Sequence, residues 1–315
     1  MTIRYSFVVP IYNDGRLARA FAAEFEQVFQ QYLSIIDLTS QVELIFVNDG
    51  SGDDSDIQLR KVCETFLFAK SISLSRNFGQ HIAVSCGYHH ASGNFVGMLN
   101  VDMEDPPGEI PNLLAVLENG DHDIVYGLYG ARNVPFSRRI TSLAFAHTLN
   151  WLTGARVPTN VSTLRVMNRT FVEAYNSLEE RARYLPGLES WLGFKHGYVS
   201  VRHQKRKVGR SSYSFRSRLR MAIESVISFS DLPLRLMAMF GFAVALCGFL
   251  SLGVIIVQKL WLVNYQPGYA STVSMIVFFG GLQILVTGLG SIYIGRVLKE
   301  VQGRPLYVIR SKYRL

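Results

Sequence analysis

The sequence predicts an α/β fold built on a mostly parallel sheet, followed by two membrane-spanning helices. Over roughly the first 130 residues, short runs that are apolar on both faces alternate with amphipathic segments. This alternation is typical of parallel strands covered by helices on both sides. Two later runs of about twenty residues contain no charged side chain, which is the length a helix needs to cross a bilayer core.

The expected strands are short and close together. They comprise residues 5–10, 42–47, 71–74, 95–100 and 123–128. After the first strand, Leu17, Phe21 and Phe25 recur every four residues, which places them on one face of a helix. Further helices are expected around Ile57–Phe66, Ala83–Ala91 and Arg138–Trp151, and a shorter strand–helix pair around Leu164–Tyr175.

Polar side chains follow three of these strands at the point where each one ends. They are Tyr12, Asn13 and Asp14, then Asn48 and Asp49, and finally Asp102, Glu104 and Asp105. In parallel sheets, ligands bind beyond the carboxyl ends of the strands. The sequence therefore predicts a site at this edge.

The acidic group after the fourth strand is the strongest candidate for a metal site. It lies in FVGMLNVDMEDPPGEIP, residues 95–111. Mg²⁺ or Mn²⁺ bridging a diphosphate needs only one or two protein carboxylates, and Asp102 and Glu104 project to the same side if the segment is extended. The alternative is a solvated turn in which Asp105 caps a helix opened by Pro106 or Pro107.

The segment GSGDDS, residues 50–55, nearly matches a dinucleotide-binding fingerprint. However, Asp53 and Asp54 would put carboxylates where a pyrophosphate should lie. Acidic residues at this place favour the N-terminus of a helix instead. The segment is not expected to bind NAD.

The net charge of +8 arises largely from one basic block. Its members are Arg202, Lys205, Arg206, Lys207, Arg210, Arg216, Arg218 and Arg220. Such a block suits a phosphorylated substrate, anionic lipid or nucleic acid. Nucleic acid is disfavoured, because the block adjoins a predicted span and lacks regularly spaced aromatic residues. The apolar stripe of Phe215–Ile227 predicts either a helix in the membrane interface or an ordinary surface helix.

The predicted spans are Leu236–Val257 and Ser274–Ile294. The loop between them carries only Lys259, whereas arginine and lysine residues flank both outer ends, so both termini are expected in the cytoplasm. We expect four regions: a cytoplasmic catalytic domain (1–211), a juxtamembrane helix (212–235), a two-helix membrane domain (236–295) and a cytoplasmic tail (296–315). The three cysteines have no disulfide or zinc-ligand spacing, which favours a reducing compartment.

Several motifs together resemble the polyisoprenyl-phosphate glycosyltransferases of glycosyltransferase family 2, a group that includes dolichol-phosphate mannose synthase, bactoprenol glucosyltransferases and undecaprenyl-phosphate formamido-arabinose transferase. The motifs are VVPIYND, VNDGSGD, LSRNFGQH, LNVDMEDPPGEIP, RKVGRSSYSF, SDLPLR and IGRVLKEVQGRPLY. The resemblance covers nearly the whole chain. It implies a Rossmann-like GT-A fold and a reaction in which a sugar is transferred with inversion from a nucleotide sugar, preferably a UDP-sugar, to undecaprenyl phosphate or a similar carrier. It further implies that the reaction depends on Mg²⁺ or Mn²⁺. The protein is expected to form a homo-oligomer, such as a tetramer, in the cytoplasmic membrane.

The resemblance also implies roles for individual residues. The nucleotide sugar is expected to contact Pro10, Tyr12, Asp14, Asp49, Asn100, Val101 and Asp102. The metal is assigned to Asp102 and Glu104, and catalysis to Asp102, Asp105 and Arg206, with Asp105 either moving a proton or orienting the sugar. The acceptor phosphate is assigned to Arg132, Arg138, Arg165, Arg206, Ser211 and Tyr213. Such arginines suit a phosphate through bidentate contacts.

Some positions depart from the family pattern. Asn48 and Asn100 replace common aspartates, Tyr129 replaces a frequent arginine, Ser212 replaces a lysine, and Thr159–Ser162 lacks an expected aspartate. Asn100 can still hydrogen-bond a ribose or a metal-bound water. Two alternatives remain open: a polysaccharide synthase of the same fold, against which the lack of a QxxRW motif argues, and a membrane-anchored protein that binds nucleotide sugars without turnover. His81, His89 and His90 are expected to pack or hydrogen-bond and not to form a second metal site.

Overall fold

The computed structural model describes residues 3–130, 160–181, 183–202 and 268–315, with a few isolated residues between 239 and 250. It contains two compact units, Met1–Ser214 with Pro305–Leu315, and Phe215–Arg304. The first unit holds the sheet and the candidate site. The second contains α10 (Tyr269–Val301).

Eight described strands form one sheet in the order β7-β5-β6-β4-β1-β2-β3-β8. Their bounds are β1 Tyr5–Ile11, β2 Val42–Asn48, β3 Ala69–Leu74, β4 Phe95–Met98, β5 Ile124–Tyr129, β6 Val161–Asn168, β7 His196–Val201 and β8 Ile309–Tyr313. Neighbouring strands pair in parallel except around β6 and β8, which run antiparallel to their partners. The predicted α/β fold with a mostly parallel sheet is therefore confirmed for the described residues.

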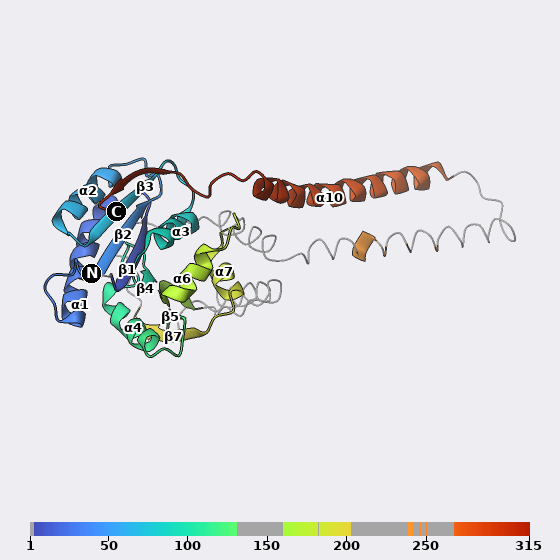
Figure 1. Cartoon of the computed structure of the whole chain (residues 1–315). Helices are drawn as coiled ribbons and strands as arrows, with labels where there is room; N and C mark the ends of the chain where they lie inside the picture. Colours follow the sequence, from blue (N-terminus) through green and yellow to red (C-terminus); the bar gives the residue numbers. More distant parts are fainter. Residues whose placement is uncertain are drawn as a thin grey trace. The chain divides into compact units, whose positions relative to one another are not determined.

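Helices cover both faces of this sheet (Figure 1). The described ones in the first unit are α1 Ala18–Leu33, α2 Ser55–Thr65, α3 Gln80–His90, α4 Ile110–Glu118, α6 Arg169–Asn176 and α7 Leu185–Trp191, with short 3-10 turns at Gly15–Leu17 and Pro107–Glu109. The strands predicted at 5–10, 42–47, 71–74 and 123–128 are confirmed, and that at 95–100 ends two residues earlier. Ile57, an apolar residue of α2, is 57% exposed.

The main hydrophobic core lies between the sheet and α1, α2 and α4. Alternate β1 residues such as Phe7 point into it, where the Phe7 ring meets the rings of Phe25 and Phe29 at centroid separations of 5.3 and 5.1 Å. Val8 faces the opposite side, where α3 packs on the sheet. The period of two along β1 thus divides its side chains between two helix layers.

Gly87 of α3 lies directly against Val8 of β1, where a Cβ atom would collide with the valine methyl groups. We expect Gly87→Ala to lower the unfolding free energy by about 1–3 kcal/mol, because overpacking forces side chains or the helix to move. Thermal unfolding in detergent measures the effect. Gly108→Ala, at a position with open space around it, is the control; equal losses in both variants would contradict the packing argument.

Among the described residues, one segment, Phe279–Val301 of α10, has the length and composition to cross a membrane. The predicted span 274–294 lies within this helix. Most of the other predicted span, 236–257, and the predicted helices around 138–151 and 215–227 lie outside the described residues. The tail expected at 296–315 contains the end of α10 and then β8, which pairs with β3 in the sheet.

Candidate functional site

The loops after β1 and β2 are joined by hydrogen bonds at the carboxyl edge of the sheet. Asn13, which has a positive φ of 58°, accepts from the Gly52 amide at 3.0 Å and donates its own amide to Ser51 Oγ at 2.9 Å. The Gly15 amide donates to Ser55 Oγ at 2.9 Å. Tyr12 is left 51% exposed beside them. The two loops thus form a fixed polar edge.

The acidic residues of segment 50–55 serve the start of α2. Asp53 Oδ1 accepts from the amide of Ser55, the first residue of that helix, at 3.0 Å. Asp54 accepts from the Gln58 side chain at 2.8 Å and makes no side-chain cap bond to the backbone. The predicted role of these carboxylates at a helix start is confirmed for Asp53.

Asp49 holds the loop that leads into α3. Its carboxylate oxygens accept from the backbone amides of Phe78 at 2.7 Å and Gly79 at 2.8 Å, and the residue is buried. Burial raises the pKa of Asp49, while these two hydrogen bonds oppose the rise. Next to it, Gly50 has φ of +63° and lies against the Arg76 backbone, where a side chain would collide. The loops after β2 and β3 are therefore packed tightly together.

The acidic segment after β4 is a turn, so the condition of an extended segment, under which Asp102 and Glu104 would project to the same side, is not met. Met103 has φ of 57°, and the Glu104 amide donates to Asp102 Oδ1 at 3.3 Å. Apolar burial of Met103 inside the core anchors this turn. Asp102 and Glu104 remain partly exposed, whereas Asp105 is only 1% exposed.

Four side chains form a continuous hydrogen-bonded chain beside this turn, here called the polar chain. Gln80 donates to Asn100 Oδ1 at 2.9 Å, and the Asn100 amide donates to Thr163 Oγ1 at 3.2 Å. Thr163 in turn donates to Asp105 Oδ2 at 2.7 Å. Asp105 is therefore not a helix cap, since its carboxylate faces β6. The other oxygen, Oδ1, is buried and makes no hydrogen bond to any residue that the structure describes.

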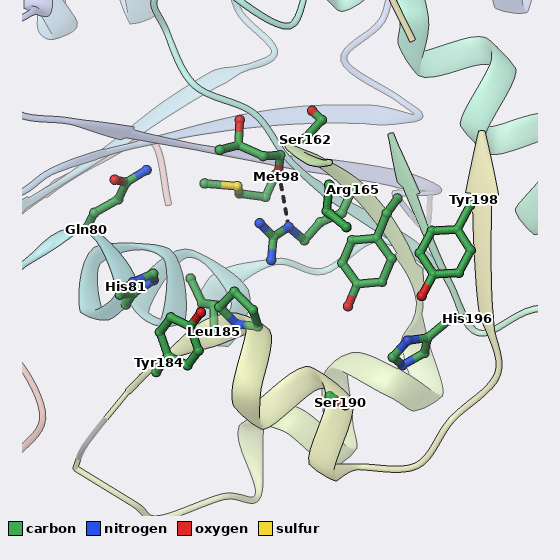
Figure 2. A pocket seen from close by; sticks show the side chains of 14 residues that line it. Gln80, His81, Met98, Ser162, Arg165, Tyr184, Leu185, Ser190, His196 and Tyr198 are labelled. Carbon is green, nitrogen blue, oxygen red and sulfur yellow. Dashed lines mark hydrogen bonds between the residues drawn. The ribbon is translucent and has the colours of Figure 1, made fainter. Parts of the chain in front are cut away.

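The polar chain borders a pocket of about 270 Å³ between α3, α7 and the strands β4 to β7 (Figure 2). Its lining residues are Gln80, His81, Met98, Tyr126, Val161, Ser162, Thr163, Arg165, Tyr184, Leu185, Pro186, Ser190, His196 and Tyr198. Most of its polar groups are hydroxyls, ring nitrogens and amides. The Tyr126 and Tyr198 rings stack at a centroid distance of 5.9 Å.

A buried ion pair lies at the pocket. Arg165 Nη1 donates to both carboxylate oxygens of Glu189, at 2.8 and 2.7 Å, and Arg165 Nε donates to the Thr163 carbonyl at 3.1 Å. Tyr126 also donates to Glu189 Oε2, at 2.9 Å. Although burial favours the neutral form, attraction to Glu189 raises the pKa of Arg165, so the guanidinium stays charged.

The neighbouring histidines make ring contacts and hydrogen bonds in the described structure. Burial, and then repulsion from Arg165, lowers the pKa of His81 to about 4, so its imidazole is neutral at pH 7. His89 and His90 contact the carbonyls of Ser85 and Cys86, one turn earlier in α3. The prediction of ordinary packing is confirmed for the last two.

The structure brings together several of the predicted site residues and leaves others undescribed. Pro10, Tyr12, Asp14, Asp49, Asn100, Val101, Asp102, Glu104 and Asp105 all lie at the carboxyl edge, in or after β1, β2 and β4. Arg165 lies in the pocket and is paired with Glu189. The positions Arg132, Arg138, Arg206, Ser211 and Tyr213 lie outside the described residues.

The donor chemistry of the turn fits a hard divalent cation. No group of three or more potential ligands from His, Cys, Asp and Glu occurs in the described ranges. A cation that also binds a diphosphate needs only one or two protein carboxylates. Asp102 and Glu104, two partly exposed residues of a single turn, offer those.

Comparisons with known proteins found a family model, full-length relatives and solved structures similar to this chain. The family model described as Glycosyl transferase family 2 matches residues 6–175. The bactoprenol glucosyl transferase of Shigella phage SfII is 31% identical over 313 residues, covering 99% of each chain. The uncharacterized glycosyltransferase sll0501 of Synechocystis is 32% identical, covering 100% of this chain and 97% of the relative. The solved glucosyl-3-phosphoglycerate synthase of Mycobacterium tuberculosis is 20% identical with a TM-score of 0.49, covering 73% of this chain and 80% of that one.

Proposed function

Because the chain belongs to glycosyltransferase family 2, we propose that it transfers a sugar, with inversion, from a nucleotide sugar to a polyisoprenyl phosphate. The proposed donor is a UDP-sugar and the proposed acceptor undecaprenyl phosphate. Relatives named bactoprenol glucosyl transferase match over the full chain, including the region after the sheet domain, which supports a lipid acceptor. The observation that carries the proposal is the partly exposed Asp102 at the carboxyl edge, after β4, a strand that lies between β6 and β1 in the sheet.

In the proposed reaction, an oxygen of the lipid phosphate attacks the anomeric carbon while the bond to the nucleoside diphosphate breaks. A phosphate monoester has a second pKa of about 6, so it is largely dianionic at neutral pH and needs no strong base. A divalent cation held by Asp102 and Glu104 would neutralise the leaving diphosphate. The chain's remaining task is to place two anions side by side.

Residues of the described structure suit that positioning. Asp49 fixes the loop at Phe78 and Gly79. The next residue, Gln80, donates a hydrogen bond to Asn100. The polar chain holds Asn100 and Asp105 in one orientation, which favours an orienting role for Asp105. We assign nucleotide contacts to Pro10, Tyr12, Asp14 and Val101 in addition. Acceptor-phosphate contacts are assigned to Arg132, Arg138, Arg206, Ser211 and Tyr213. Arg165, the remaining arginine of that prediction, is paired with Glu189 in the pocket and is not assigned to the acceptor phosphate.

A membrane location follows from the proposed acceptor. The apolar segment of α10 together with the uncharged run 236–257 would give two spans with both termini in the cytoplasm. Residues 212–235 would lie at the interface, where basic side chains meet anionic headgroups. We further propose a homo-oligomer.

The test is a reconstituted transfer assay. Purified full-length protein is expected to move label from UDP-glucose, or another donor in a panel of nucleotide sugars, into the organic phase with undecaprenyl phosphate and Mn²⁺. Undecaprenol, which lacks the phosphate, is the matched control acceptor and should give no product. Chelation by EDTA should abolish transfer and added Mn²⁺ should restore it. Tight donor binding without lipid product for any donor would instead favour a nucleotide-sugar-binding protein.

A further inference from the structure

The pocket beside the polar chain is electrically balanced. Among its described lining residues, Arg165 is the one side chain charged at neutral pH, since burial lowers the pKa values of His81 and His196. Figure 2 shows the Arg165 guanidinium among the labelled side chains, with His81 and Tyr184 to one side and His196 and Tyr198 to the other. Its positive charge faces a space that a ligand can enter.

Glu189 cancels this charge from behind the pocket wall. It is 0% exposed, and both its oxygens accept from Arg165. The Tyr126 hydroxyl binds the same carboxylate and so fixes its position. Because the two charges cancel, the pocket has no net positive charge that would attract an anion.

The pocket's size and lining suit one sugar ring. Its volume of about 270 Å³ lies near the lower end of the range of ligand pockets, about 300 Å³, so it holds a small group and not a whole nucleotide sugar. The stacked Tyr126 and Tyr198 rings provide apolar surface for C–H groups, and Ser190 provides a hydroxyl. Gln80 and Thr163 belong both to the pocket and to the polar chain that holds Asn100. The pocket therefore shares two residues with the chain that holds Asn100, a proposed nucleotide-sugar contact.

We propose that Glu189 determines sugar selectivity: by pairing with Arg165 it makes the pocket accept an uncharged sugar ring and reject a sugar that carries a carboxylate. The inference rests on the proposed function, because the sugar is taken to be that of the donor. A carboxylate entering this pocket would bring a net negative charge into a buried space, and the desolvation of that charge would go uncompensated.

The decisive variant is Glu189→Gln, which keeps the shape of the side chain and removes its charge. Arg165 then lacks a counter-ion, and a carboxylate on the sugar would supply one. We expect the ratio of kcat/KM for UDP-glucose to that for UDP-glucuronic acid to fall at least about tenfold, equivalent to about 1.4 kcal/mol. Binding of UDP-glucuronic acid without acceptor, measured by calorimetric titration, should tighten by a similar factor.

Two further variants separate charge from structure. The double variant Arg165→Gln with Glu189→Gln removes both charges, so its pocket stays neutral and its selectivity should stay close to that of the wild type. Glu173→Gln on α6 changes an exposed glutamate and should leave the ratio unaltered. If the kcat/KM for UDP-glucuronic acid rises as much in the double variant as in Glu189→Gln, then loss of packing explains the change and the inference is wrong.

A ligand comparison with the wild-type protein keeps the test valid should Glu189→Gln fail to fold. UDP-glucuronic acid and the same donor with its carboxylate converted to a primary amide differ in charge and little in shape. The wild type should bind the amide at least about tenfold more tightly. Equal binding of acid and amide would overturn the inference while leaving transferase activity intact, whereas absence of transfer from every donor would overturn the proposed function.

Discussion

Replacing Asp102 by alanine is expected to lower turnover by about 10³-fold or more, with little change in stability. The expected loss matches that seen when an enzyme is deprived of a group that stabilises charge in the transition state. Asp102 is partly exposed in a turn that Met103 anchors in the core, so truncation of the carboxylate removes charge without opening a cavity. Single-turnover assays in the presence of Mn²⁺, with thermal unfolding as the folding check, measure both quantities.

A matched control and a binding measurement make this prediction specific. Asp121→Ala, an exposed carboxylate in the loop before β5, should retain full turnover. Titration of Mn²⁺ in the presence of UDP should show weaker binding in Asp102→Ala and a smaller loss in Glu104→Ala. Wild-type turnover in Asp102→Ala would remove the basis of the proposed metal site.

Replacing Asp49 by alanine is expected to damage both stability and donor binding. Two backbone amides, those of Phe78 and Gly79, would lose their acceptors in a partly buried place, and an unsatisfied buried group costs about 1–3 kcal/mol. Because the loop can relax toward water, we expect a total loss of about 2–4 kcal/mol in unfolding free energy. The KM for the donor should rise, since this loop leads directly to Gln80.

Thermal unfolding and amide hydrogen exchange at Phe78 and Gly79 test this prediction. Asp37→Ala is the matched control, because Asp37 also accepts two hydrogen bonds, both from Thr39, but in an exposed loop. The loss of unfolding free energy in Asp37→Ala should be well under half of the loss in Asp49→Ala. The unfolding free energy of Asp49→Asn, which keeps one acceptor oxygen, should lie between those of the wild type and Asp49→Ala. Unchanged exchange at Phe78 in Asp49→Ala would show that the carboxylate does not hold the loop.

Much of the sheet could be predicted because its central strands are buried on both faces. The apolar runs of β1, β2 and β3 have that pattern, and α1 repeats phenylalanines on one face. The direction of β6 could not be predicted, because an antiparallel strand among parallel ones has a similar composition. The strand β8 is short and lies after a predicted span, so its pairing with β3 is a long-range property.

The site was only partly predictable, for reasons of local geometry. Polar residues at strand ends predicted which side chains lie at one edge of the sheet, but the turn made by the positive φ of Met103 could not be predicted from the sequence. Glu189 was missed, although a charged residue in the apolar run LPGLESW of α7 is a signal for a buried ion pair. Thr163 and Tyr126 were missed too, since their importance comes from partners far away in the chain.

The pairing of β8 with β3 also affects how the protein is made. During synthesis, β3 leaves the ribosome more than two hundred residues before Ile309–Tyr313, and α10 must be produced in between. Until then, the hydrogen-bonding edge of β3 is bare, and such edges invite pairing with other nascent chains. The sheet is therefore complete only after the apolar helix has been made, so the enzyme cannot mature before synthesis of that helix is finished.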